Sequence, residues 1–298
     1  MPAIRMISTG EGAVHRAVKL EVALMSRAHL RFARSLITLL FPAVVACTQP
    51  LQPPFDPAAI SGAPQQPNDA SAQFVLGGCR LGAPTVMLRE GASDQPGSRL
   101  LQYWEMPNHP VWWSDATPAS TAYKDYRRKV AANVSLTDPV RLLQRSPTHN
   151  NKIVVAEARN WIRPANCLEK LLQAEQHSRV DAFKTPTEFL SFVLLSADEK
   201  RVRVYFYTVN YDGIGAATPV SAPVVQARED GWTVLAGLHN HGFHPGQPTL
   251  DGILAPSSPD AHFNFNFAGR VGMKEAWITN GLHTVRIPAS AFGQFERE

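Results

Sequence analysis

The sequence predicts an α+β protein with a mixed central β-sheet flanked by helices, and three observations indicate this. Arg201–Val209 alternates charged with apolar residues, which is the period of a half-buried strand. Thr233–Leu238 is an apolar run of strand length. Thr121–Ala132 and Cys167–His177 have the spacing of apolar residues typical of helices.

The charge of the chain is unevenly distributed. Of 298 residues, 44% are hydrophobic, which is enough to fill a core, and the formal net charge is +4. Six of the 29 Lys and Arg residues and two of the 25 Asp and Glu residues lie in residues 1–46, which leaves 23 of each from residue 47 onward. Because that larger part is neutral, we predict no nucleic-acid partner.

Residues 1–46 have the layout of a secretory signal peptide. Three arginines in residues 25–35 are followed by a short apolar stretch over residues 36–45 and by small residues before Cys47. The apolar stretch is too short to span a bilayer as a helix. Residues 1–24 lack any feature of their own, so the predicted translation start is Met25 and the N-terminus is over-extended.

The segment Val44–Cys47 resembles the lipobox of bacterial lipoproteins. The resemblance implies that Cys47 is lipid-modified and becomes the first residue after cleavage, and that the chain is anchored to a bacterial membrane in the cell envelope. Thr48 after the cysteine, by the same resemblance, favours the outer membrane. An ordinary signal peptide or an uncleaved N-terminal anchor is the alternative.

The rest of the chain divides into three parts. Residues 47–72 are rich in Pro, Gln, Ala and Ser and predict a lipidated flexible tether. Residues 73–180 form a mixed α/β region of unassigned role, with strand-like pieces at Gln73–Leu76 and Thr85–Leu88. Within it, Lys152–Ala158 is a short buried strand or the start of a helix. The same region contains an aromatic cluster of Tyr103, Trp104, Trp112 and Trp113. We expect this cluster either to line a ligand groove or to pack in the core.

Two cysteines remain after the lipid attachment site. Cys79 and Cys167 can form a disulfide if the chain is exported to an oxidising compartment. Two unpaired buried thiols are the alternative.

The last part, residues 181–298, is predicted to complete the sheet. Thr185 is a plausible helix N-cap with Glu188 in its capping box, and the apolar segment after it continues that helix. A turn at residues 197–200 precedes the strand at Arg201–Val209. Ala276–Ile278 and His283–Ile287 are candidate closing strands.

The predicted chemistry lies at the end of one strand. His239 and His241 follow Thr233–Leu238, and residues i and i+2 of an extended chain point to the same face. Both imidazoles can therefore reach one metal ion, with Asp260 as a third ligand from the following loop. Two imidazoles and a carboxylate leave a fourth position for water, which is the arrangement of a catalytic zinc site.

These residues resemble the metal signature of the JAB/MPN/JAMM metallopeptidases, His-x-His followed by Ser-x-x-Asp. The resemblance spans about residues 180–265 and implies a JAB/MPN-like (cytidine-deaminase-like) fold for the C-terminal domain. It implies zinc ligation by His239, His241 and Asp260, and Ser257 as a donor that steadies the tetrahedral intermediate. The family also uses an upstream glutamate as general base, for which Glu188 matches best.

The sequence departs from the family in the loop after the second histidine. The fifteen residues between His241 and Ser257 exceed the usual length, and Gly242 replaces the usual proline. His244 or Asp251 could therefore replace one of the ligands, and Glu157 is an alternative general base.

Two functions follow from these patterns. The first is an exported lipoprotein with a zinc-dependent hydrolase site, a peptidase or isopeptidase that acts on a peptide or protein. The second is a non-catalytic envelope lipoprotein that serves as a binding or assembly module on a metallopeptidase-like scaffold.

Overall fold

The structure is a computed structural model and describes residues 79–210, 218–246 and 251–297. The predicted signal peptide, Cys47, the tether and the strand-like piece Gln73–Leu76 lie outside the described residues. None of the helices in the described ranges combines the length and the apolar character needed to cross a bilayer.

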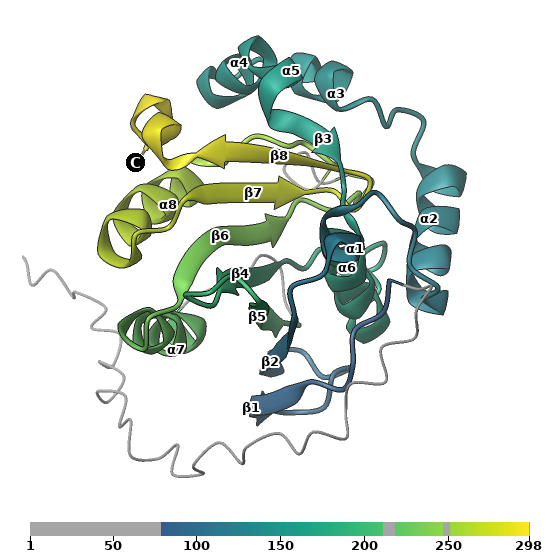
Figure 1. Ribbon diagram of the computed structural model, residues 1–298. Helices are drawn as coiled ribbons and strands as arrows, with labels where there is room; N and C mark the ends of the chain where they lie inside the picture. Colours follow the sequence, from purple (N-terminus) through teal and green to yellow (C-terminus); the bar gives the residue numbers. More distant parts are fainter. Residues whose placement is uncertain (1–78, 211–217, 247–250, 298) are drawn as a thin grey trace, which may run out of the picture. The chain divides into compact units, whose positions relative to one another are not determined.

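The strands of the described residues form one eight-stranded sheet in the order β1-β2-β5-β4-β6-β7-β8-β3 (Figure 1). β6 and β7 are parallel, and the other neighbours are antiparallel. The prediction of an α+β protein with a mixed sheet and helices is therefore confirmed. The strands are β1 (Thr85–Glu90), β2 (Arg99–Pro107), β3 (Ile162–Pro164), β4 (Phe189–Leu195), β5 (Arg201–Val209), β6 (Thr233–Asn240), β7 (Glu275–Thr279) and β8 (His283–Pro288).

Helices cover both faces of this sheet (Figure 1). Residues of α7 and α8 pack in one buried apolar cluster, and residues of α1 and α6 pack in a second cluster. The helices are α1 (Pro110–Trp113), α2 (Thr121–Asn133), α3 (Pro139–Arg145), α4 (His149–Ala156), α5 (Ala158–Trp161), α6 (Cys167–Arg179), α7 (Thr218–Glu229), α8 (Ser258–Val271) and the 3₁₀ helix η4 (Ala289–Gln294).

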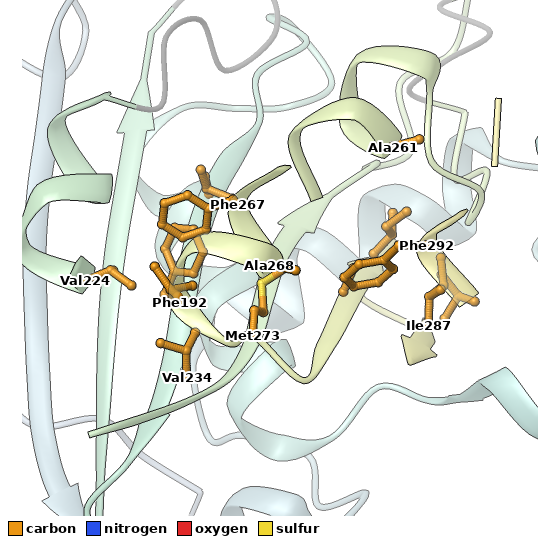
Figure 2. Close-up of a cluster of buried hydrophobic side chains, with 14 of the residues drawn as sticks. Phe192, Val224, Val234, Ala261, Phe267, Ala268, Met273, Ile287 and Phe292 are labelled. Atoms are coloured by element: carbon orange, nitrogen blue, oxygen red, sulfur yellow. The ribbon is translucent and has the colours of Figure 1, made fainter. Parts of the chain in front are cut away.

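The central strand β4 contributes side chains to both clusters. Phe192 and Leu194 belong to the cluster under α7 and α8, whereas Phe189 and Val193 belong to the other. Figure 2 shows Phe192 against the ring of Phe267 from α8, and their ring centroids are 4.9 Å apart. A strand that is buried on both faces is largely apolar along its whole length, and Ser191 is the one polar residue of β4.

The predicted helix start at Thr185 is therefore wrong. The chain enters β4 at Phe189, and Glu188 directly precedes this strand. The apolar run after Glu188 lacks the alternation of a half-buried strand because both of its faces are covered, so its pattern alone did not distinguish it from a helix.

Strands from residues 73–180 belong to the same sheet as those from residues 181–298. β2 pairs with β5 over nine residues, and β3 pairs with β8 at the sheet's edge. Residues 152–156 lie in α4, so the helical alternative holds for them. Trp104 and Trp112 are buried, and Trp113 packs edge-on against Trp277. Trp104 and Trp112 therefore pack in the core, whereas Tyr103 and Trp113 are partly buried at its edge.

A disulfide joins Cys79 to Cys167, with 5.8 Å between the two Cα atoms. Both residues are buried, and Cys167 is the first residue of α6. The bond thus fixes the start of the described chain to the helix that packs under β4 and β6.

Replacing both cysteines by alanine should lower the free energy of unfolding by about 2–4 kcal/mol, because the bond closes a long loop in the unfolded chain. The two cysteines are 88 positions apart in the sequence. Guanidinium unfolding of the oxidised protein and of the Cys79→Ala/Cys167→Ala variant measures the difference. Equal midpoints for the two proteins would contradict the bond.

Candidate metal centre

The two histidines lie at the end of β6, in the interior of the sheet. His239 pairs with Leu190 of β4 on one side and with Ile278 of β7 on the other. The His241 backbone N–H donates to the carbonyl of Thr279 at 2.9 Å, which continues the extended chain beyond β6. His239 and His241 are 7% and 4% exposed. Both imidazoles therefore leave the same face of the chain in a buried position, as the spacing predicts.

Asp260 completes the cluster from the first turn of α8. Its backbone N–H is bonded to the hydroxyl of Ser257, the N-cap, and its carboxylate accepts from the Ser257 backbone N–H in return. The Ser257 hydroxyl also donates to Asp260 Oδ2 at 2.7 Å. This capping box fixes the carboxylate at the start of the helix and directs one of its oxygens towards the histidines.

Three ligand atoms meet at this point. The Nε2 atoms of His239 and His241 are 3.2 Å apart. Asp260 Oδ2 lies 3.4 Å from His239 Nε2 and 3.3 Å from His241 Nε2. The three side chains could hold a metal ion, and they are the one group with this arrangement among the described residues.

The long loop after His241 determines which nitrogen of that ring faces the cluster. Gly252 has a φ of +77°, and a Cβ atom there would lie 2.2 Å from the ring of Phe243. Only glycine fits at position 252 of this loop. The next residue of the loop then places its carbonyl, that of Ile253, 2.8 Å from His241 Nδ1. Because a carbonyl only accepts, Nδ1 carries a hydrogen, so in the neutral ring the lone pair on Nε2 faces the cluster.

The charges of the cluster are strongly coupled. Burial lowers the pKa of His241, but hydrogen bonding and charge from Asp260 outweigh burial, so the pKa rises from 6.5 to about 9. Burial raises the pKa of Asp260, but the two histidines hold it well below its usual value. The metal-free cluster is therefore an ionised carboxylate beside a protonated His241 at neutral pH.

The affinity of the cluster for a divalent metal ion should increase roughly tenfold per pH unit towards pH 9 and level off above it, because a bound ion would have to displace the His241 proton. The folded-state pKa of about 9 exceeds the usual 6.5. Protonation therefore stabilises the metal-free fold fully below pH 6.5, and this contribution is lost as the pH rises through 9. Competitive zinc titration against a chelator between pH 6 and 9.5 measures the slope. An affinity independent of pH would contradict it.

Glu188 lies beside the cluster, directly before β4, the strand next to β6. Its Oε1 is 3.9 Å from His241 Nε2, and its side chain is 14% exposed. β4 runs antiparallel to β6 with Leu190 opposite His239, so the same register continued by two residues sets Glu188 opposite His241. A carboxylate within 4 Å of the cluster is in range to exchange a proton with a molecule bound there.

Asn240, between the two histidines, was not identified from the sequence. It is fully buried and faces away from the metal cluster, because successive residues of a strand alternate. Its Oδ1 accepts from the Phe189 backbone N–H at 2.7 Å, and its Nδ2 donates to the Thr187 carbonyl at 3.5 Å. Asn240 therefore holds the backbone on both sides of Glu188.

The alternative ligands and base lie elsewhere. Asp251 pairs with Arg145 of α3, at 3.7 Å. Glu157 caps the end of α4, where it accepts a hydrogen bond from Asn160. His244, in the loop after β6, is not one of the three clustered ligands. Within the described ranges, the structure brings together the three residues first expected to bind metal.

Neither a known protein family, nor a curated protein, nor a solved structure matches this chain. The similarity to JAB/MPN/JAMM metallopeptidases therefore stays a prediction based on the motif.

Proposed function

We propose that His239, His241 and Asp260 bind zinc. The residue types suit this ion, since zinc in proteins takes imidazole nitrogens and carboxylate oxygens. The distances suit it as well. Ligand atoms bound at about 2.0–2.1 Å around a tetrahedral ion are about 3.3 Å apart, and the three atoms here are separated by 3.2, 3.3 and 3.4 Å.

The function that this site supports best is hydrolysis of an amide bond in a peptide or protein. A zinc ion with three protein ligands supplies a site for water, lowers its pKa to about 7 and polarises a carbonyl. Glu188 takes a proton from the attacking water. As the water oxygen bonds to the carbonyl carbon and the carbon–nitrogen bond breaks, Glu188 returns the proton to the leaving amine.

Other residues of the chain position these groups. Ser257 orients the Asp260 carboxylate, the Ile253 carbonyl orients His241, and Asn240 holds the backbone around Glu188. The family motif assigns Ser257 a further role as a donor to the substrate oxygen, for which its hydroxyl would have to turn away from Asp260 Oδ2, to which it donates in the structure. The observation that carries the proposal is the position of Glu188, a separate carboxylate 3.9 Å from a nitrogen of a three-ligand cluster.

The motif and the location of the site favour a divergent member of the JAB/MPN fold. The leader favours an exported protein anchored through lipid on Cys47, in the outer membrane. In a bacterial host, Cys47→Ser should move the protein from the membrane fraction to the soluble periplasmic fraction. A serine variant that stays in the membrane fraction would contradict lipid anchoring.

Peptide hydrolysis by the zinc-loaded protein tests the proposed activity. We expect cleavage of peptides from a quenched fluorescent library, loss of cleavage after chelation, and recovery when zinc is restored. A protein that binds one zinc ion but cleaves no peptide would contradict hydrolysis and favour the binding module.

A further inference from the structure

A cavity of about 290 Å³ lies next to the metal cluster. His241 of the cluster and the N-cap Ser257 are among its lining residues, so a molecule in the cavity lies next to one of the three ligands. The lining also includes Thr148, in the turn between α3 and α4, and Glu296, which follows η4. Segments that are far apart in the sequence thus build one cavity at the metal centre.

A buried amide joins these segments. Asn150 of α4 is 6% exposed, and its Nδ2 donates to the Pro256 carbonyl at 2.9 Å. Its Oδ1 accepts from the Glu296 backbone N–H at 2.8 Å, and its Nδ2 also lies 3.4 Å from the Glu296 carbonyl. Pro256 directly precedes the N-cap Ser257. Asn150 therefore holds the backbone of Glu296 next to the backbone that leads into the N-cap Ser257.

The lining of the cavity defines which groups it can accept. Ile253, Ala255 and Pro256 supply an apolar wall beside the metal cluster. Glu296 is the one acidic residue of the lining, and the lining contains no Lys or Arg. The main chain of Glu296 makes both of the bonds to Asn150. The residue is exposed, so the Glu296 carboxylate is available to a ligand.

We propose that this cavity binds the substrate, and that it selects a short peptide whose free amino terminus pairs with the Glu296 carboxylate. The inference rests on the proposed hydrolase function and names its substrate class. A protonated amine complements the Glu296 carboxylate, the one acid of a lining that has no Lys or Arg, and short aliphatic side chains complement Ile253 and Ala255. The volume is at the lower limit of about 300–1,000 Å³ for small-molecule sites, which suits a peptide of a few small residues.

The test compares two peptides that differ only at the amino terminus, Ala-Ala-Ala amide and its N-acetylated form. Binding is measured by calorimetry to the zinc-loaded Glu188→Gln protein, in which turnover is expected to be strongly slowed. We expect the free amine to bind about tenfold more tightly, as for one charge-assisted pair. Glu296→Gln in the same background should remove this preference, and Glu296→Asp should retain part of it.

Glu229→Gln is the matched control, because it removes an exposed acid at the end of α7, away from the cavity lining. This variant should keep the preference. Equal binding of the two peptides, no binding of either, or a preference that survives Glu296→Gln would overturn the inference. If wild-type protein hydrolyses peptides without dependence on Glu296, only the inference fails. If the preference holds and wild-type protein hydrolyses neither peptide, the amine site stands and the hydrolase proposal fails.

Discussion

Replacing His239 by alanine is expected to weaken zinc binding roughly a thousandfold, because one of three ligands contributes a large share of the binding free energy of such a site. His239 contributes one corner of the triangle of ligand atoms, 3.2 Å from His241 Nε2 and 3.4 Å from Asp260 Oδ2. Isothermal titration with zinc and a competing chelator measures the affinity, and peptide cleavage should disappear with it.

His262→Ala is the control for this experiment. His262 is exposed on α8, two residues after Asp260, and belongs to no metal-binding group of the described residues. Its replacement should leave the affinity for zinc unchanged. If His239→Ala and His262→Ala bind zinc as tightly as the wild type does, the ion is held elsewhere.

The second large effect is expected for Glu188→Gln. The amide keeps the size of the side chain but cannot accept a proton from water, so the rate of hydrolysis should fall by about 10²–10⁴. Glu188 is not one of the three clustered ligands, so zinc should still bind with an affinity within a few-fold of the wild type. Stopped assays of kcat, together with a zinc titration of the same sample, separate the two effects.

Glu157→Gln distinguishes the two glutamates that the sequence left as candidates for the general base. Glu157 caps α4 and bonds to Asn160, so its replacement should leave kcat unchanged. A loss of activity in Glu157→Gln, with full activity in Glu188→Gln, would reverse the assignment.

The parts of the fold that were predicted correctly are those with a clear local pattern. β5 has the bounds expected from its alternation, and the expected closing strands lie within β7 and β8. The i, i+2 spacing of His239 and His241 likewise placed both rings on one face, because strand geometry fixes side-chain direction locally.

β4 could not be recognised in this way. Whether its apolar run is a strand or a helix depends on having β5 and β6 on its two sides and helices on both faces. β5 follows β4 after a short turn, but β6, α7 and α8 come from later segments of the chain, so their contacts with β4 leave no signal in its local pattern. Glu188 was nevertheless chosen as the base from the motif, although the helix expected around it is a strand.

The residues that position the site left even less signal. Ile253 acts through its backbone carbonyl, which every residue has, so no side-chain pattern could indicate it. Asn150 lies in a region where the sequence showed no chemistry, and its role depends on contacts with Pro256 and Glu296, more than 100 residues away. Asn240 was within the motif, but its side chain faces the opposite side of the strand.

Anomalous diffraction at the zinc absorption edge, from crystals grown with stoichiometric zinc, tests the central claim most directly. We predict one strong peak bonded at about 2.0–2.1 Å to the nitrogens of His239 and His241 and to an oxygen of Asp260. A zinc-loaded crystal with no peak at these three side chains, or with its zinc bound by other residues, would contradict it.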